Sequence, residues 1–512
     1  MKKNAFLSFL LAFVLLLSSC SVVGEEPEKT EKILSGNVEN DKNNIEIIEP
    51  FSLRIPFDFK EGFAPYEAKS KTNRFVCSLL YRSMVRLTSS YRYELNLLSS
   101  IATEDNITWY LYLDDDLTFP NGTEFTAYDL KYSIQQAMEE NSYYASSLEI
   151  VQSVSVVNAN CCRVILHYAD KHFPNLLTFP VISYETIRNP LFFPDRYVLS
   201  DNGTTLVGAE NSDLPVIELI ASDNPDLLVY EMRMGRYDCV YCRDPLSLGT
   251  SSAGALNGLQ SNRMVYLGFN SGSAFPYYSA FRKAVASAID YEYLSTYIYN
   301  YFASEPKGIY SPDFFEVTYT AKRSLDIMSA NFLLDDMGLT NRDSDNFRTN
   351  SRGKRIRLSL IVCGESSVKV TAANAIAEML REIGVEVSVT SLSYSAFLTA
   401  LEKGSYDLYL AEVRIGADMD FSRLITPWNY TLSDIEYINY GMNNYEGLYL
   451  QWLGYMGGTV TATEWNRAFD DVMPFIPLCY AKSSVIFSRD LPFVFGGTDF
   501  DMFYNIESWK TE

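Results

Sequence analysis

Between Arg355 and Ala411 the sequence alternates strand and helix patterns so regularly that few folds are compatible with it. In order, the patterns predict a strand over 356–362, a helix over 368–383, a strand over 385–389, a helix over 394–402 and a strand over 406–411. Gly384 and Gly404 follow the two helices, as is typical of helix C-termini. Strands joined in this way form right-handed crossovers, so the segment predicts a largely parallel sheet in an α/β domain.

The stretch Thr108–Met138 predicts a strand, a turn and a capped helix. Alternate residues of its first part are apolar and share one face: Trp109, Leu111 and Leu113. Asn121-Gly122 is typical of a turn, and Thr126–Asp129 has the spacing of a capping box. Elsewhere we expect a strand over 45–56, helices over 73–86 and 280–290, a hairpin over 151–168 and a loop over 201–208.

The N-terminus carries the pattern of an export signal. Two lysines precede an apolar run over 5–17, which is shorter than the ~20 residues that a membrane span needs. Leu17-Ser-Ser-Cys20 resembles a bacterial lipobox, and the resemblance implies cleavage before Cys20 and lipid attachment to its thiol. Residues 21–45 are polar and charged, so we expect a disordered tether. The remaining chain, roughly 465 residues, is long enough for two or three domains.

The charge of the chain excludes several kinds of partner. Lysine and arginine total 42 against 64 acidic residues, a net charge of −22, which argues against binding nucleic acid or an anionic membrane surface. The 37 tyrosines and 31 phenylalanines are high counts for a soluble chain. We expect most of them in the core, and part of the surplus is consistent with an aromatic-lined pocket.

Enzyme and metal motifs are missing from the sequence. It has no G-x-S-x-G, H-E-x-x-H or P-loop phrase, and His167 and His172 are its only histidines. Cys239 and Cys242 therefore lack partners for a zinc site, and a disulfide or free thiols both remain open. We expect no resident metal or cofactor and no catalysis, although the carboxylate pair of a glycosidase would leave no such motif.

Several phrases resemble those of one protein family. Phe119–Leu130 reads FPNGTEFTAYDL, and further phrases stand at Met264–Asn270, Phe281–Val285, Ala330–Gly338 and Met473–Tyr480. Together they resemble the family 5 extracellular solute-binding proteins, which include oligopeptide-, dipeptide- and nickel-binding subunits of ABC importers. Asp114 stands where this family usually has a basic residue, which indicates a divergent member.

The resemblance implies a two-lobed, periplasmic-binding-protein-like (clamshell) α/β fold. We expect the first lobe at 46–267 and 478–512, with an accessory subdomain at about 90–180, and the second lobe at 268–477. The implied function is a monomeric, membrane-anchored lipoprotein outside the cytoplasm that delivers a peptide or peptide-like ligand to the permease and ATPase subunits of an ABC importer. A peptide sensor without import, an oligosaccharide-binding subunit and an extracellular hydrolase are the alternatives.

The ligand contacts are expected after the third strand of the parallel segment, in the loop 411–421, because ligands of such sheets bind at the carboxyl ends of the strands. Asp418 and Asp420 resemble the later acidic positions of the family's phrase, although a capped turn leading into the next element is the simpler explanation of both. Arg414 or Ile415 falls where peptide-binding relatives have the aspartate that meets the α-amino group. Arg414 is suited instead to a carboxylate or phosphate. The other candidates are Trp428, Asn439, Tyr440 and Asn270.

Overall fold

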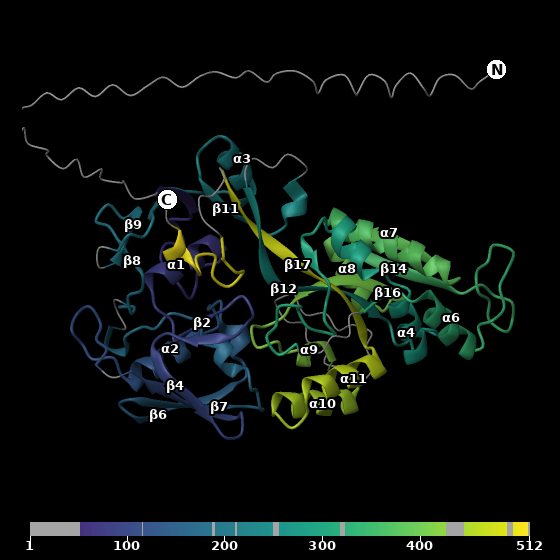
Figure 1. Cartoon of the computed structure of the whole chain (residues 1–512), viewed down its shortest axis with the longest axis horizontal. Coiled ribbons are helices and arrows are strands. Elements are labelled where there is room, and N and C mark those ends of the chain that lie inside the picture. The colour runs from purple at the N-terminus through teal and green to yellow at the C-terminus, as the bar shows by residue number, and fades with distance from the viewer. Residues whose placement is uncertain are drawn as a thin grey trace, which may run out of the picture. The chain divides into compact units, whose positions relative to one another are not determined.

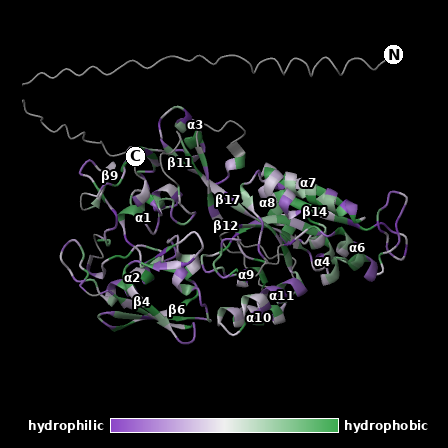
Figure 2. Ribbon diagram, in the orientation of Figure 1, coloured by the Kyte–Doolittle hydropathy of each residue, from purple (hydrophilic) through white to green (hydrophobic). Residues whose placement is uncertain are grey.

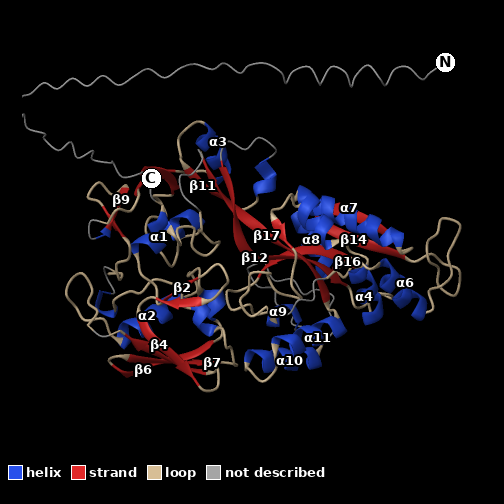
Figure 3. Ribbon diagram, in the orientation of Figure 1, coloured by secondary structure: helices blue, strands red, loops and turns tan. Residues whose placement is uncertain are grey.

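The computed structural model describes residues 52–114, 116–186, 190–209, 212–248, 255–317, 323–425, 445–488 and 495–509 (Figure 1). Helices and strands are mixed throughout this part of the chain (Figure 3). Hydrophobic residues gather on the sheets and on the inner helix faces, while hydrophilic residues concentrate in the loops (Figure 2). Within the described ranges, no helix has both the length and the apolar character needed to cross a membrane.

A seven-stranded sheet organises the C-terminal half. Its order is β11 (Cys239–Cys242), β17 (Phe475–Phe487), β12 (Ala255–Phe269), β16 (Leu408–Arg414), β14 (Arg357–Cys363) and β15 (Glu386–Leu392), with β13 (Ala303–Ser304) also on β17. β14 is parallel to β15 and β16, while β12 is antiparallel to β16 and β17. The predicted parallel segment is therefore confirmed, with α7 (Ser367–Glu382) and α8 (Tyr394–Glu402) as its crossover helices.

Further helices pack around this sheet: α4 (Ser279–Ser287), α5 (Tyr291–Tyr293), α6 (Ile327–Asp336), α9 (Ser422–Ile425), α10 (Glu446–Met456) and α11 (Ala462–Val472). Shorter helical turns are η1 (Ala145–Leu148), η2 (Phe173–Leu176), η3 (Tyr184–Thr186), η5 (Pro225–Leu227), η6 (Pro245–Leu248), η7 (Leu294–Ile298) and η8 (Ile506–Ser508). Apolar residues from 264–481 and Tyr91 form the large core between these elements.

An antiparallel sheet carries the predicted strand–turn–helix stretch. Its order is β4 (Leu98–Thr103), β5 (Thr108–Leu113), β7 (Cys161–Leu166) and β6 (Val151–Asn158), and α2 (Ala127–Ala137) packs against β6 and β7. The β6–β7 pair confirms the predicted hairpin. Asp129 Oδ2 accepts hydrogen bonds from the Thr126 backbone N–H (2.8 Å) and hydroxyl (3.0 Å) at the start of α2. Apolar residues from 66–193 form the core of this region.

Two sequence predictions about the N-terminal region were wrong in part. The helix expected over 73–86 is α1 (Lys71–Leu80), which ends six residues earlier than predicted. The residues that follow it are extended and include β2 (Val85–Leu87), which pairs with β3 (Tyr93–Leu95). The helix ends early because Leu79 packs in one core, whereas Val85 packs in the core of the antiparallel sheet.

The second error concerns the loop expected over 201–208, because residues 205–208 form β9 (Thr205–Gly208). Leu206 is fully buried and pairs with Ile217. This strand belongs to a four-stranded sheet with β1 (Ser52–Phe57), β10 (Val216–Ala221) and β8 (Tyr197–Leu199), followed by α3 (Leu228–Arg233).

The long strands β12 and β17 pair along most of their length (Figure 1). Their residues contribute to two cores. Leu259 of β12 packs with the N-terminal strands and the C-terminal segment, whereas Leu267 packs in the large core. Between them lies what we call the polar middle, defined as Ser261–Arg263 on β12 and Ser483–Ser484 on β17. All five of these residues are buried. The β12–β17 register shifts between Leu259 and Arg263, and such a bulge re-aims side chains.

Candidate ligand-binding site

A cavity of about 680 Å³ lies beside the polar middle of the long strands. Its lining comes from segments far apart in the sequence: 67–69, 138–149, 175–178, Asn262, 414–417, Arg423 and Phe500. Small-molecule sites are typically clefts of roughly 300–1,000 Å³ with a few placed polar groups. Its size and varied lining make this cavity the candidate ligand site.

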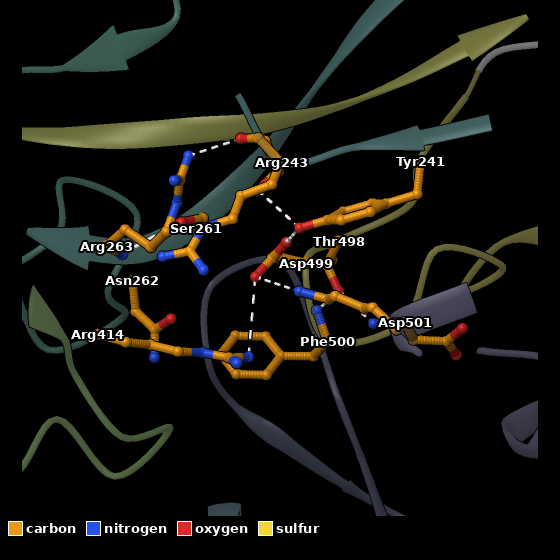
Figure 4. Close-up of polar contacts among 12 residues, drawn as sticks. Tyr241, Arg243, Ser261, Asn262, Arg263, Arg414, Thr498, Asp499, Phe500 and Asp501 are labelled. Carbon is orange, nitrogen blue, oxygen red and sulfur yellow. Dashed lines mark hydrogen bonds and ion pairs between the residues drawn. The ribbon is translucent and has the colours of Figure 1, made fainter. Parts of the chain in front are cut away.

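Arg414, a residue predicted to contact the ligand, lines this cavity. It is the last residue of β16 and pairs in register with Arg263 of β12. The Arg414 Nη1 donates a hydrogen bond to Tyr143 Oη (2.6 Å). The Arg414 Nη2 lies 3.9 Å from Asp499 Oδ2 (Figure 4). The loop expected from residue 411 therefore starts after Arg414, because β16 continues to the point where β12 pairing ends.

Asp499 joins three segments at this place. It is 2% exposed and forms an ion pair with Lys71 Nζ (2.6 Å). It also accepts a hydrogen bond from Tyr241 Oη (3.1 Å) (Figure 4). Burial alone would raise the pKa of Asp499, but the charges of Lys71 and Arg414 lower it. Burial lowers the pKa of Lys71 to about 7, against the opposing effect of Asp499. The result is a buried carboxylate shared by two cationic side chains.

Asn262 reaches the cavity from the bulge in β12. It is 1% exposed; its backbone carbonyl accepts a hydrogen bond from Ile415 N–H (3.0 Å), and its Nδ2 donates to the Ile415 carbonyl. Its Oδ1 is buried and finds no donor within the described part of the chain. An unpaired buried acceptor of this kind is costly to the folded state.

An ion network lies next to the cavity on the same strands. Arg263 Nη1 contacts Asp244 Oδ1 (2.9 Å) and Glu412 Oε1 (3.3 Å), and Glu412 Oε2 lies 3.2 Å from Lys369 Nζ. Burial would raise the pKa of Glu412, but Arg263, Lys369 and Arg243 lower it to about 2. A smaller cavity of about 180 Å³ adjoins these side chains and the N-terminus of α7.

Asp418 and Asp420 are not among the residues that line the large cavity. Asp420 N–H donates to Asp418 Oδ1 (3.2 Å), and Asp420 Oδ1 accepts from Ser422 N–H (2.7 Å), as in the capped turn considered from the sequence. Tyr168 Oη donates to Asp420 Oδ2 (3.4 Å), and the fully buried Asp170 lies close by. Burial, with the charge of Asp420, raises the pKa of Asp418 to about 7.

The remaining predicted site residues have other positions. Asn270 follows β12, and its Nδ2 donates to the carbonyls of Gly404 (3.1 Å) and Tyr406 (2.9 Å) rather than lining the cavity. Trp428, Asn439, Tyr440 and Cys20 lie outside the described residues.

Sequence reasoning missed Asn262, Tyr143, Lys71 and Asp499. For Asn262 a signal existed, because the polar run Gln260–Arg263 directly precedes the apolar run Met264–Leu267 of the same strand. The other three come from separate segments that only the folded chain brings together.

Thiol and metal chemistry have little geometric support in the described residues. Seven cysteines there are free: Cys77, Cys161, Cys162, Cys239, Cys242, Cys363 and Cys479. Burial raises the pKa of Cys239 and, to about 11, that of Cys242, so both are poor nucleophiles near neutral pH. Across the same ranges no group of three or more histidine, cysteine, aspartate or glutamate side chains is placed to hold a metal ion.

Comparisons with solved structures identify the fold. NikZ from Campylobacter jejuni in complex with Ni(L-His) is 16% identical, with a TM-score of 0.60 over 90% of this chain and 99% of its own. The oligopeptide-binding protein AppA from Bacillus subtilis, solved with a nonapeptide, is 15% identical, with a TM-score of 0.55 over 90% and 99%. The periplasmic murein tripeptide-binding protein MppA, in its unliganded open form, is 16% identical, with a TM-score of 0.68 over 90% and 96%. The fold is therefore that of the two-lobed periplasmic binding proteins.

Sequence comparison assigns the family. No curated protein sequence matches the chain. The family model described as "Bacterial extracellular solute-binding proteins, family 5 Middle" matches residues 92–210 and 232–431, which is more than half of the chain. The chain belongs to the family 5 extracellular solute-binding proteins of bacteria.

Proposed function

We propose that this protein captures a peptide or peptide-like solute outside the cytoplasm and delivers it to the permease of an ABC importer. The ligand would lie between two lobes and stabilise their closed arrangement through contacts that only this arrangement offers. We place the first lobe at 46–267 and 478–512, with the accessory subdomain at about 90–180, and the second at 268–477. The protein acts by binding, as a monomer, and leaves ATP hydrolysis to a separate subunit.

The observation that carries this proposal is that separate parts of the chain together form the lining of the cavity. Two parts of the chain, one around residues 138–149 and one around 414–423, contribute polar groups to its lining beside Asn175, Thr178 and Asn262. Pairs of side chains connect the two parts: Tyr143 with Arg414, and Glu149 with Arg423. A ligand held among these groups would contact both parts at once, as capture by closure requires.

The anchoring also remains a proposal. Cys20 would carry the lipid, and residues 21–45 would form the tether to the folded body. Several buried acyl chains, at ~0.8 kcal/mol per methylene, would hold such a protein stably at a membrane.

Native mass spectrometry tests the ligand class. We would express the chain from Ser21 and purify it without refolding, so that captured ligand stays bound. Added masses that release as a mixture of peptides would support peptide capture. A single non-peptide mass, such as an oligosaccharide, would overturn the ligand class but leave the family assignment intact.

A further inference from the structure

A contact outside the cavity also joins distant parts of the chain. The turn 314–316 lies between Ser90 and His172. On one side, Phe315 N–H donates to the Ser90 carbonyl (3.0 Å). On the other, the His172 ring packs edge-on against the rings of Phe314 and Phe315, with centroids 5.3 and 5.6 Å away. With the lobe boundaries proposed above, the turn belongs to the second lobe and both of its neighbours belong to the first.

Glu316 is at the centre of this contact. Its Oε2 lies 2.7 Å from Lys171 Nζ and 3.4 Å from His172 Nε2, and it accepts a hydrogen bond from Tyr455 Oη (2.8 Å). Burial would raise the pKa of this carboxyl, but the contacts with His172, Lys171 and Tyr455 lower it to about 2. The group is therefore an anion at neutral pH, and hydrogen bonds to an anion are the strong ones.

Lys171 also binds the end of a helix in the second lobe. Its backbone N–H donates to the Met456 carbonyl (3.0 Å) at the C-terminus of α10, and its Nζ lies 3.8 Å from the centre of the Tyr455 ring. Asn106 Nδ2 donates to the Gly457 carbonyl (3.2 Å) beside it. A cation and N–H donors complement the carbonyls and the partial negative charge of a helix C-terminus.

We call the residues that meet at this carboxylate the Glu316 clasp: Lys171, His172, Glu316 and Tyr455. None of them is among the described residues that line the cavity. A ligand in the cavity can compete with the Tyr143–Arg414 pair, which does line it, but not with the clasp. The clasp therefore favours the closed arrangement with or without ligand.

We propose that the Glu316 clasp holds the two lobes together independently of ligand, so that the ligand-free protein is already partly closed. The inference rests on the proposed function, because it concerns the closure that captures the ligand. Apparent affinity falls with the fraction of molecules in the binding-competent arrangement, so residues outside the cavity can set it. Since the clasp does not touch the ligand, it changes the affinity for every ligand by one factor and leaves their order unchanged.

Hydrogen exchange of the ligand-free chain tests the clasp. The chain from Ser21 would be freed of captured ligand by unfolding and refolding, and native mass spectrometry would confirm the ligand-free mass. The amides of Lys171 and Phe315 both donate across the contact. We expect Glu316→Gln to speed their exchange by about tenfold or more, while exchange in β14 stays as in the wild type. Equal exchange of these amides in wild type and Glu316→Gln would overturn the inference.

Glu386→Gln is the matched control. The Glu386 side chain is 24% exposed, against 25% for Glu316, and its ion pair with Arg357 (2.9 Å) joins neighbouring strands of one sheet. The same chemical change at this position should leave both affinity and the exchange of the clasp amides unchanged. Equally faster exchange of those amides in Glu386→Gln would show general loosening and contradict a specific clasp.

Titration with a tripeptide library, followed by native mass spectrometry, measures the effect on affinity. We expect Glu316→Gln and Lys171→Met each to weaken the binding of every bound peptide severalfold and by a common factor. The double variant should lose less than the product of the two, because both changes remove one pair. Unchanged affinity in both variants, or losses that differ between peptides, would overturn the inference.

The two measurements separate this inference from the proposed function. Wild-type protein that binds no peptide would overturn peptide capture. The exchange of the Lys171 and Phe315 amides would still decide whether the clasp closes the ligand-free protein.

Discussion

Glu412 and Asp244 both form an ion pair with the buried Arg263, but their side chains differ in solvent exposure. The Glu412 side chain is 11% exposed and that of Asp244 is 62% exposed, while Arg263 is 5% exposed. Glu412→Gln leaves Arg263 and Lys369 short of a buried counter-charge, which typically costs about 3–5 kcal/mol. Asp244→Asn removes a solvent-screened partner and should cost about 1 kcal/mol or less. Urea denaturation of both variants checks this difference, and equal losses would contradict it.

Asp418 provides a pH-dependent test at the same scale. Its pKa is raised to about 7 by burial and by Asp420, and Asp170 and Tyr168 also face this pair, with Arg423 and Lys171 as the nearby cations. The native state therefore holds a proton that the unfolded chain releases near pH 4. The stability from this group is present below about pH 4 and is lost as the pH rises toward 7, by at most about 1.4 kcal/mol per pH unit.

We expect Asp418→Asn to lose this part of the pH dependence. The free energy of unfolding of the ligand-free protein, measured for wild type and variant at several values between pH 4 and 7, should show a wild-type advantage that shrinks with rising pH. Parallel curves would mean that Asp418 titrates near its ordinary value.

At the scale of elements, Asp129 connects a helix start to a distant loop. Its Oδ2 accepts from Thr126, and its Oδ1 accepts from the Tyr184 backbone N–H (3.0 Å), with the side chain 1% exposed. Asp129→Ala leaves buried donors unpaired, and we expect a loss of about 3 kcal/mol. Gln135→Ala, on the exposed face of α2, is the control and should change the thermal unfolding midpoint little. A loss for Asp129→Ala no larger than that of the control would contradict this role.

Elements whose ends are marked by neighbouring residues were predictable from the sequence, whereas elements that depend on pairing with distant segments were not. The segment 355–411 was predicted correctly because its strands alternate and its helices end at glycines. The polar half of β12 could not be predicted as a strand, because it is extended through pairing with β17, more than two hundred residues away. The same reason hides the site: Arg414 stood out in the loop expected after a strand, but Lys71 and Asp499 meet only after the C-terminal segment returns.

At the scale of the molecule, the long strands should make the cores unfold together. Leu259 and Leu267 lie on one strand, both fully buried, yet in different cores. Leu→Ala at either position should cost about 2–5 kcal/mol through lost burial and the resulting cavity. Because β12 and β17 run through both cores, each variant should lower the temperature of the main calorimetric transition as a whole. If Leu259→Ala instead split the transition, the two cores would be independent folding units, and the polar middle would be a flexible joint rather than a continuous pair of strands that fixes Asn262 and Arg414 in one site.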